Sequence, residues 1–201
     1  MSSTVLYMSM SLDGFIAGPN EGPDNGLGDG GSRLHEWVFP GAEGGDFDAA
    51  VERLRGVNRQ VYDEFMSTGA VIAGRGTFEP AGGWGGDHHD GVPLYILSRS
   101  PAPPWAAAWP AVHYTSSLET AVSEAKRAAG EKNVLVHGAG LAQRALPAGL
   151  LDELEIHLVP VLFGDGRRLF EHLGVRQREL ERIRVLEGDG GVTHLRYRVR
   201  R

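Results

Sequence analysis

Glycine, arginine and hydroxyl side chains follow a short apolar run at residues 70–73, and together they could bind an anion. The four residues after the run are Gly74, Arg75, Gly76 and Thr77. A strand that enters a helix through glycine leaves free backbone N–H groups at the helix start, and these favour a phosphate. The Arg75 guanidinium suits bidentate phosphate contact. Taken alone, the motif fits better with a tight turn that leaves Arg75 in solvent, because a single Gly-x-Gly is weak evidence.

Two more apolar runs end in residues of the same kinds. These residues are Ser98 and Arg99 after the run at 95–97, and Gly138, Ala139 and Gly140 after the run at 134–136. In open α/β sheets, ligands bind in the crevice outside the carboxyl ends of the strands. A cofactor with several phosphates needs donors at several such ends. The sequence therefore predicts one anion site that is shared by three strands.

The segment from Asp87 to Asp90 contains two adjacent histidines between two aspartates, a set that could bind a metal. Neighbouring side chains in an extended loop point apart, and no third ligand follows at helical spacing. We therefore expect a solvated loop and no metal. The sequence has no cysteine, which excludes disulfides, thiolate catalysis and cysteine zinc sites.

Length and composition are those of one ordinary globular domain. The chain has 201 residues, of which 41% are hydrophobic and 23% charged, and nothing divides it, so a single domain over residues 1–201 is expected. The net charge of −6 argues against nucleic acid as a partner. The N-terminus lacks the pattern of a signal peptide, and no apolar run approaches the roughly 20 residues of a membrane span. We expect a cytoplasmic protein without a membrane partner.

The elements around the candidate residues indicate an α/β chain. A β-rich segment at 4–10 predicts the first strand, and apolar residues at helical spacing predict a helix over 46–67, which Gly56 weakens. Residues 18–45 are rich in glycine and proline and too long for a simple connector. With Trp37, this segment is either an ordered flap over a site or a patch on the core.

The last part of the chain has the pattern of strands. Residues 153–159 and 192–199 alternate strictly, and residues 178–186 do so less regularly. This pattern predicts partly antiparallel strands that close the sheet. Arg196 and the arginines that alternate with apolar residues after it are expected on the solvated face of the last strand.

Several short motifs, taken together, resemble the dihydrofolate reductase-like superfamily. Ser9-Met-Ser-Leu-Asp-Gly-Phe-Ile-Ala, Gly149-Leu-Leu-Asp-Glu-Leu-Glu-Ile and Pro160-Val-Leu-Phe-Gly-Asp-Gly are similar to one branch of it. That branch holds the reductase half of the bifunctional riboflavin-biosynthesis deaminase/reductase and its stand-alone bacterial relatives. The resemblance runs from about Val5 to Val199. It implies a three-layer α/β/α fold with a mainly parallel, doubly wound sheet and antiparallel C-terminal strands.

The resemblance also implies NADPH as the cofactor, bound across the strand ends. The resemblance gives each segment a role. The adenosine-side phosphates would be met by Gly74, Arg75, Gly76 and Thr77, and the 2′-phosphate would be bracketed by Ser98 and Arg99, opposite Arg75. The pyrophosphate would be held by Gly138, Ala139, Gly140 and Leu141. Two guanidinium groups favour NADPH over NADH, because a ribose hydroxyl would leave them unpaired.

The catalytic residues implied by the resemblance lie after the first strand. The nicotinamide would contact Ser11, Asp13 and Ala17. Asp13 is the carboxylate that we expect to orient a substrate N–H or to stabilise an iminium, and the alternative role for it is to cap its own Asp-Gly turn. The cofactor supplies the hydride chemistry, and the protein supplies position, charge and exclusion of water.

Trp37, Asn58 and Gly164 are the residues expected to face the substrate. Dihydrofolate reductases carry an acid on the helix before the Gly-Arg strand, whereas the same spacing here reaches Asn58, so folate reduction is doubtful. The riboflavin-pathway enzyme delivers hydride to a sugar carbon and does not need this acid. It does need a basic pocket for a 5-phosphate, for which the candidates are Arg33, Arg53 and Arg59.

Three functional hypotheses follow. The first is an NADPH-dependent reductase similar to the 5-amino-6-(5-phosphoribosylamino)uracil reductase of riboflavin biosynthesis, acting on a heterocyclic small molecule. The second is dihydrofolate reductase-like activity on a pterin, and the third is an NADPH-binding protein without catalysis. The family resemblance also implies a homodimer, for which the C-terminal strands offer an interface.

Overall fold

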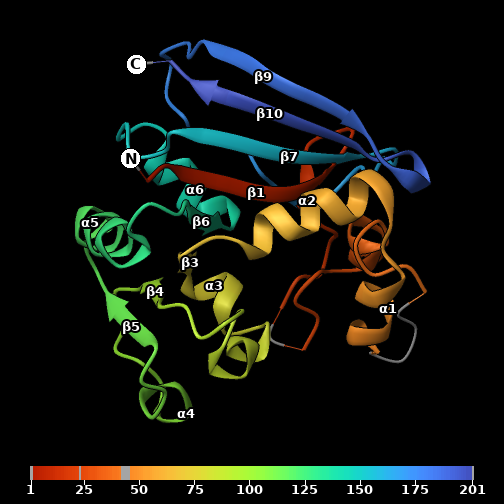
Figure 1. Ribbon diagram of the computed structural model, residues 1–201. Coiled ribbons are helices and arrows are strands. Elements are labelled where there is room, and N and C mark those ends of the chain that lie inside the picture. The colour runs from red at the N-terminus through yellow and green to blue at the C-terminus, as the bar shows by residue number, and fades with distance from the viewer. Residues whose placement is uncertain (1, 23, 42–45, 201) are drawn as a thin grey trace.

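A computed structural model describes residues 2–22, 24–41 and 46–200, and a mixed eight-stranded sheet forms its centre (Figure 1). The strand order is β5 (Val112–Thr115), β4 (Leu94–Leu97), β3 (Ala70–Gly74), β6 (Val134–His137), β1 (Thr4–Ser11), β7 (Glu153–Val159), β10 (Thr193–Val199) and β9 (Leu180–Glu187). The first six strands are parallel, whereas β10 is antiparallel to both β7 and β9. A short antiparallel ribbon pairs β2 (Phe15–Ala17) with β8 (Arg167–Arg168).

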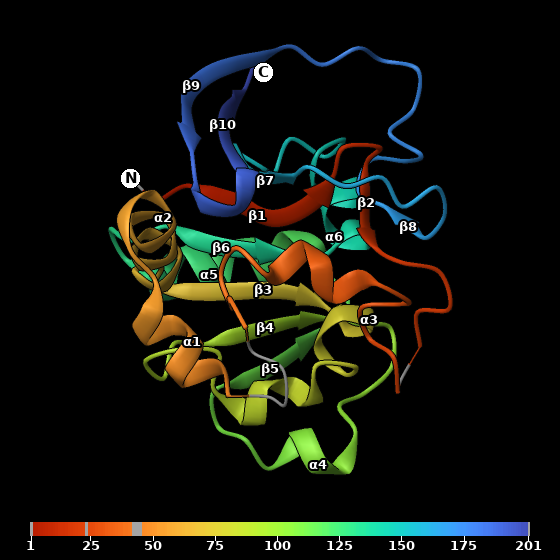
Figure 2. The same cartoon turned by 90° about the vertical axis from the view of Figure 1, so that its right-hand side faces the viewer.

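Helices cover both faces of the sheet. On one face, α5 (Leu118–Ala129) and α6 (Ala139–Ala145) pack their alanines and leucines on Ile72 and Val136. On the other face, Phe65 of α2 (Gly56–Met66) packs on Tyr7 and Leu135 (Figure 2). The predicted three-layer α/β/α arrangement, with a mainly parallel sheet and antiparallel C-terminal strands, is therefore confirmed.

The remaining described elements are short, and they connect or cover the strands. They are α1 (Phe47–Arg53), α3 (Arg75–Phe78), α4 (Pro104–Ala107) and the 3₁₀ segments η1 (Gly31–His35), η2 (Gly82–Gly86) and η3 (Asp189–Gly191). No helix in the described ranges is long and apolar enough to cross a membrane.

The single helix predicted over 46–67 is wrong in its middle. α1 ends at Arg53, Leu54 is extended with ψ 139°, and α2 begins at Gly56. Gly56 has φ +55°, a left-handed conformation that suits glycine and interrupts the helix. The break buries Leu54 in the apolar cluster beneath the flap.

Residues 31–39 of the flap lie against the sheet. Leu34, Trp37 and Val38 are buried with Val61 of α2 and Val159 of β7. The flap therefore completes the hydrophobic core, which is one of the two roles considered for it.

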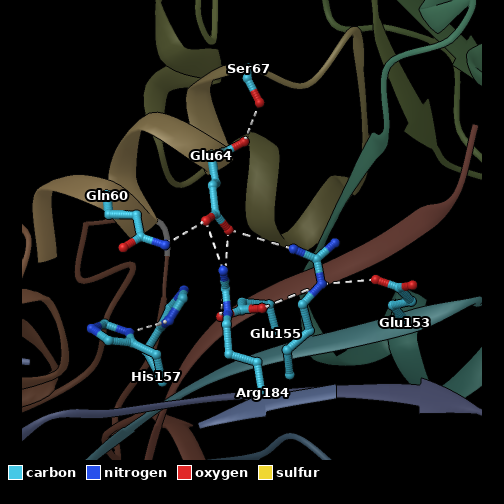
Figure 3. A network of polar contacts seen from close by, with 9 residues as sticks. Gln60, Glu64, Ser67, Glu153, Glu155, His157 and Arg184 are labelled. Atoms are coloured by element: carbon cyan, nitrogen blue, oxygen red, sulfur yellow. Dashed lines mark hydrogen bonds and ion pairs between the residues drawn. The ribbon is translucent and has the colours of Figure 1, made fainter. Parts of the chain in front are cut away.

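The sheet face beneath α2 carries an ion-pair network (Figure 3). Arg184 donates to both carboxylate oxygens of Glu64, at 2.7 and 2.6 Å, and to Glu155 at 3.2 Å. Nε of Arg196 lies 2.8 Å from Glu153 and 3.6 Å from Glu155. The Arg196 side chain is only 15% exposed, so the prediction that it lies on a solvated face is wrong. The reason is that α2 covers this part of the sheet and supplies Glu64 as a counter-charge.

Candidate active site

The structure brings the three donor-rich segments together at the carboxyl edge of the sheet. β3 and β4 are in register at their last residues, Gly74 and Leu97, and β3 and β6 are in register at Ala73 and His137. The segments that follow these three parallel strands therefore leave the same edge side by side. This is where ligands bind in open α/β sheets.

Gly138 lies against Thr77, so two of these segments are in contact. Its backbone has φ +94° and ψ 148°, a conformation that other residues rarely adopt. A Cβ at this position would lie 2.3 Å from Oγ1 of Thr77. The fold itself therefore requires glycine at position 138.

Gly138→Ala is expected to destabilise the protein and to distort the edge of the site. The positive φ and the contact with Thr77 together should cost about 1–3 kcal/mol in the free energy of unfolding, measured by urea titration. Gly140→Ala is the matched control, because a Cβ at that position meets no atom within 4 Å. Equal stability of the two variants would contradict the expected clash.

Glycine at positions 74, 76 and 140 has a different explanation. A Cβ at each would meet no protein atom within 4 Å, and Gly74 has an ordinary φ of −80°. The fold does not require glycine at these positions, whereas a ligand that approaches the backbone closely would. This bare backbone fits a phosphate chain such as the pyrophosphate of a dinucleotide. Ala139 and Leu141 are buried, so only their backbone groups could contribute.

Two guanidinium groups are available at this edge. Arg75 is 54% exposed and contacts Glu79 at 3.4 Å, and exposed Arg99 forms no ion pair with the described residues. The Ser98 hydroxyl, by contrast, is used in its own turn, where it donates to the Ser100 carbonyl at 2.7 Å. A cavity of about 390 Å³ adjoins Arg75 and is also lined by Gly76, Glu79, Pro80, Pro103 and Trp105.

Asp13 holds a loop from the distant C-terminal part of the chain. Its carboxylate accepts hydrogen bonds from the Ser11 hydroxyl at 2.6 Å and from the backbone N–H groups of Phe163 and Gly164 at 3.1 and 2.8 Å. The Ser11 hydrogen bond is the main reason that the pKa of Asp13 falls to about 2. Asp13 is thus a charged acceptor that fixes the predicted substrate residue Gly164, and its contact with a substrate stays a prediction.

Ala17 lies beside the same loop. Gly166 approaches it so closely that a Cβ on Gly166 would lie 2.1 Å from the Ala17 carbonyl oxygen. Contacts thus link Ser11, Asp13, Ala17 and Gly164 next to the end of β1, where Ser11 and Ala17 are themselves buried.

Trp37 and Asn58, both predicted to face the substrate, contact each other, and their contact with a substrate stays a prediction. The Asn58 amide nitrogen donates to the Trp37 carbonyl at 3.0 Å and to the Asp189 carbonyl at 3.2 Å, and Oδ1 lies 3.1 Å from Nε2 of His194. Asn58 is only 4% exposed. The indole N–H of Trp37 donates to the Ser9 hydroxyl at 2.9 Å.

The three arginines considered for a substrate phosphate each have a partner nearby. Arg33 pairs with Glu36 and Arg59 with Asp63, while Arg53 donates to the Pro40 carbonyl. The structure gives no sign that the three converge on one pocket.

Buried histidines beneath α2 and the flap were not predicted as site residues. Nδ1 of His157 lies 2.9 Å from Nδ1 of His194, and Nδ1 of His88 lies 2.8 Å from Nδ1 of His89. The expectation of a solvated loop around His88 and His89 is wrong, because His89 is buried and its Nε2 lies 3.1 Å from the Thr68 carbonyl. The alternation in β7 does place His157 on the same face as Glu155, but alternation does not show whether that face is covered.

Five histidines, which do not include His89, have lowered pKa values and are therefore neutral at pH 7. Burial is the main cause in each case: it lowers the pKa of His88 to about 2 and the pKa values of His137 and His194 to about 4. The pKa values of His35 and His157 are also lowered, that of His157 well below its usual value. Neutral imidazoles offer one donor and one acceptor each.

The sheet order and the donor-rich edge define an α/β protein with a dihydrofolate reductase-like fold. The family model of the RibD C-terminal domain matches residues 3–193, and the chain belongs to this family. No curated protein matches the sequence.

Three solved structures show the same fold at low sequence identity. A provisionally assigned riboflavin biosynthesis protein from Shewanella sp. PV-4 is 20% identical with a TM-score of 0.72, over 99% of each chain. A pyrimidine reductase-like protein from Corynebacterium diphtheriae is 14% identical with a TM-score of 0.63, over 100% of this chain and 92% of the other. Dihydrofolate reductase from Enterococcus faecalis, complexed with NADP(H) and RAB-propyl, is 14% identical with a TM-score of 0.58, over 99% and 97%.

Proposed function

We propose that this protein is an NADPH-dependent reductase that transfers a hydride to a heterocyclic small molecule, as in the reductase step of riboflavin biosynthesis. Membership of the RibD C-terminal domain family supports the reductase class. The NADP(H) in the Enterococcus faecalis structure supports the cofactor. A cytoplasmic homodimer is the state that we expect for such an enzyme.

The observation that carries the proposal is the shared edge of β3, β4 and β6. Its bare glycines leave room for a pyrophosphate, and Arg75 and Arg99 supply the two guanidinium groups that a 2′-phosphate needs. The cofactor, when bound, would supply the hydride. Asp13, which is held next to the buried Ser11 and Ala17, would orient the reacting ring.

Titration with NADPH and NADH tests the proposal. We expect tighter binding of NADPH, and a loss of roughly 10- to 100-fold in NADPH affinity for Arg75→Gln and for Arg99→Gln. NADH affinity should change little, because its ribose hydroxyl does not need the guanidinium groups. Arg127→Gln, on the exposed side of α5, is the matched control and should bind NADPH as the unmodified protein does. Equal and negligible binding of both cofactors would refute the proposal.

A second candidate is an NADPH-binding protein without catalysis. The observation in its favour is that the Asp13 carboxylate is occupied by Ser11 and the 163–164 loop. Oxidation of bound NADPH by an aminopyrimidine would exclude this alternative. Pterin reduction has less support, since Asn58 replaces the expected acid and its amide is bonded within the protein.

A further inference from the structure

The side-chain amide of Asn58 has one possible orientation. One of its two terminal atoms lies 3.0 and 3.2 Å from the carbonyl oxygens of Trp37 and Asp189. Carbonyl oxygens only accept hydrogen bonds, so this atom must be the nitrogen. The Asn58 oxygen therefore faces Nε2 of His194, 3.1 Å away, and this nitrogen must carry a hydrogen.

The orientation of Asn58 fixes the tautomers of two histidines. Because neutral His194 carries its hydrogen on Nε2, its Nδ1 has a lone pair and accepts. Nδ1 of His157, 2.9 Å away, must then be the donor. Neutral His157 has only one ring hydrogen, so its Nε2 has none and can accept a hydrogen bond.

Nε2 of His157 has no hydrogen-bond partner among the described residues, yet it is not one of the buried polar atoms sealed from solvent. His157 itself retains 4% exposure. It pairs with Ser9 on β1, two residues before Ser11. The acceptor at Nε2 of His157 has therefore not been used by the fold.

The surroundings of His157 already hold a planar heterocycle with an N–H group. The Trp37 indole lies 4.5 Å from the His157 ring and 4.8 Å from the His194 ring, measured between centroids. Its N–H donates to the Ser9 hydroxyl. The Trp37 indole ring and the Ser9 hydroxyl that accepts from its N–H group thus both lie near His157.

We propose that Asn58 is a positioning residue that acts through His194 to present Nε2 of His157 as the acceptor for an N–H group of the heterocyclic substrate. The ligand in this inference rests on the proposed function, whereas the tautomers are a property of the protein alone. A neutral acceptor at Nε2 of His157 favours a substrate that places an N–H group opposite it. A substrate carbonyl or carboxylate there is disfavoured, because two acceptors would then face each other.

Long-range ¹H–¹⁵N NMR of the full-length protein, labelled at histidine, tests the tautomers at pH 7.5. His157 is expected in the Nδ1–H form and His194 in the Nε2–H form, with resonances assigned from His157→Gln and His194→Gln. His157 in the Nε2–H form would overturn the inference in the unmodified protein, whether or not any variant folds.

One substitution tests the role of Asn58. Asn58→Leu removes the acceptor for His194, and His157 should populate both forms. The His88–His89 pair is an internal control in the same spectrum. Which of its two Nδ1 atoms donates depends on the contact between Nε2 of His89 and the Thr68 carbonyl, and not on Asn58. A single His157 tautomer in folded Asn58→Leu would contradict the inference.

The substrate contact is tested with 5,6-diaminouracil in the presence of NADPH. The Nε2 resonance of His157 should shift on addition of this probe, and the probe should bind roughly tenfold more weakly to Asn58→Leu. A bound probe that leaves this resonance unmoved would overturn the acceptor role. Absence of NADPH binding would instead refute the proposed function and leave the tautomer result standing.

Discussion

Lowering the pH from 7 to 5 is expected to destabilise this protein strongly, because five buried or half-buried histidines have lowered pKa values in the folded state. They are His35, His88, His137, His157 and His194, and burial lowers the pKa of each. In the unfolded chain, each would titrate near pH 6.5. Below that pH the unfolded state binds more protons, so stability falls as the pH falls.

The size of the effect is large relative to the stability of a domain. Each histidine that is neutral in the folded state and charged in the unfolded state contributes about 1.4 kcal/mol per pH unit. Several such groups together can lower the stability by a few kcal/mol per pH unit below pH 6, against roughly 5–15 kcal/mol of total stability. Burial raises the pKa of Glu155, which acts in the opposite direction but involves one group.

Urea titrations at several pH values between 7.5 and 5.5 measure this slope. His88→Gln should reduce it by the contribution of one group, about 1.4 kcal/mol per pH unit. His113→Gln, at an exposed position on β5, is the matched control for the substitution itself. A slope no larger than that of a single group in the unmodified protein would contradict neutral burial of the set.

Arg184→Met is expected to cost about 3–5 kcal/mol in the free energy of unfolding. Arg184 bridges Glu64 on α2 and Glu155 on β7, and Glu155 is fully buried. Removal of the guanidinium leaves a buried carboxylate with Arg196 alone, 3.6 Å away. The loss should appear as a lower urea midpoint.

A second substitution separates the buried charge from the packing of the side chain. Arg184→Met combined with Glu155→Gln should recover much of the loss, because the carboxylate left behind is then neutral. Arg182→Met, on an exposed position of the same strand, should change stability by no more than about 0.5 kcal/mol. A loss of similar size in Arg182→Met would mean that the strand, and not the ion pair, is sensitive.

Patterns local in sequence predicted most of the fold and the edge of the sheet at which the three donor-rich segments meet. Apolar runs that end in glycine locate β3 and β6, and alternation locates β7 and β10, because strand periodicity depends on the chain alone. The break at Gly56 was not predicted. It is stabilised by the burial of Leu54, and this burial depends on contacts with the flap. Arg196 was wrongly expected on a solvated face for a similar reason, because its burial depends on helix α2, which is distant in the sequence.

Polar side chains on a covered face are the hardest to assign from sequence. His157 alternates with apolar neighbours as any exposed polar residue would, and only the packing of α2 and Trp37 over it shows that it is buried. Its partner His194 is 37 residues away and meets it through antiparallel pairing of β7 and β10. A contact between residues so far apart in the sequence cannot be inferred from a local sequence pattern.

Because Asp13 accepts hydrogen bonds from residues 163 and 164, the two halves of the proposed cofactor site can form only at different stages of protein synthesis. A nascent chain that has emerged as far as residue 145 already holds the ends of β3, β4 and β6. It still lacks the loop that Asp13 binds, which follows β7 some 150 positions after the aspartate itself. The phosphate-binding half can therefore take shape on the ribosome, whereas the half beside the reacting ring must wait for the last quarter of the protein.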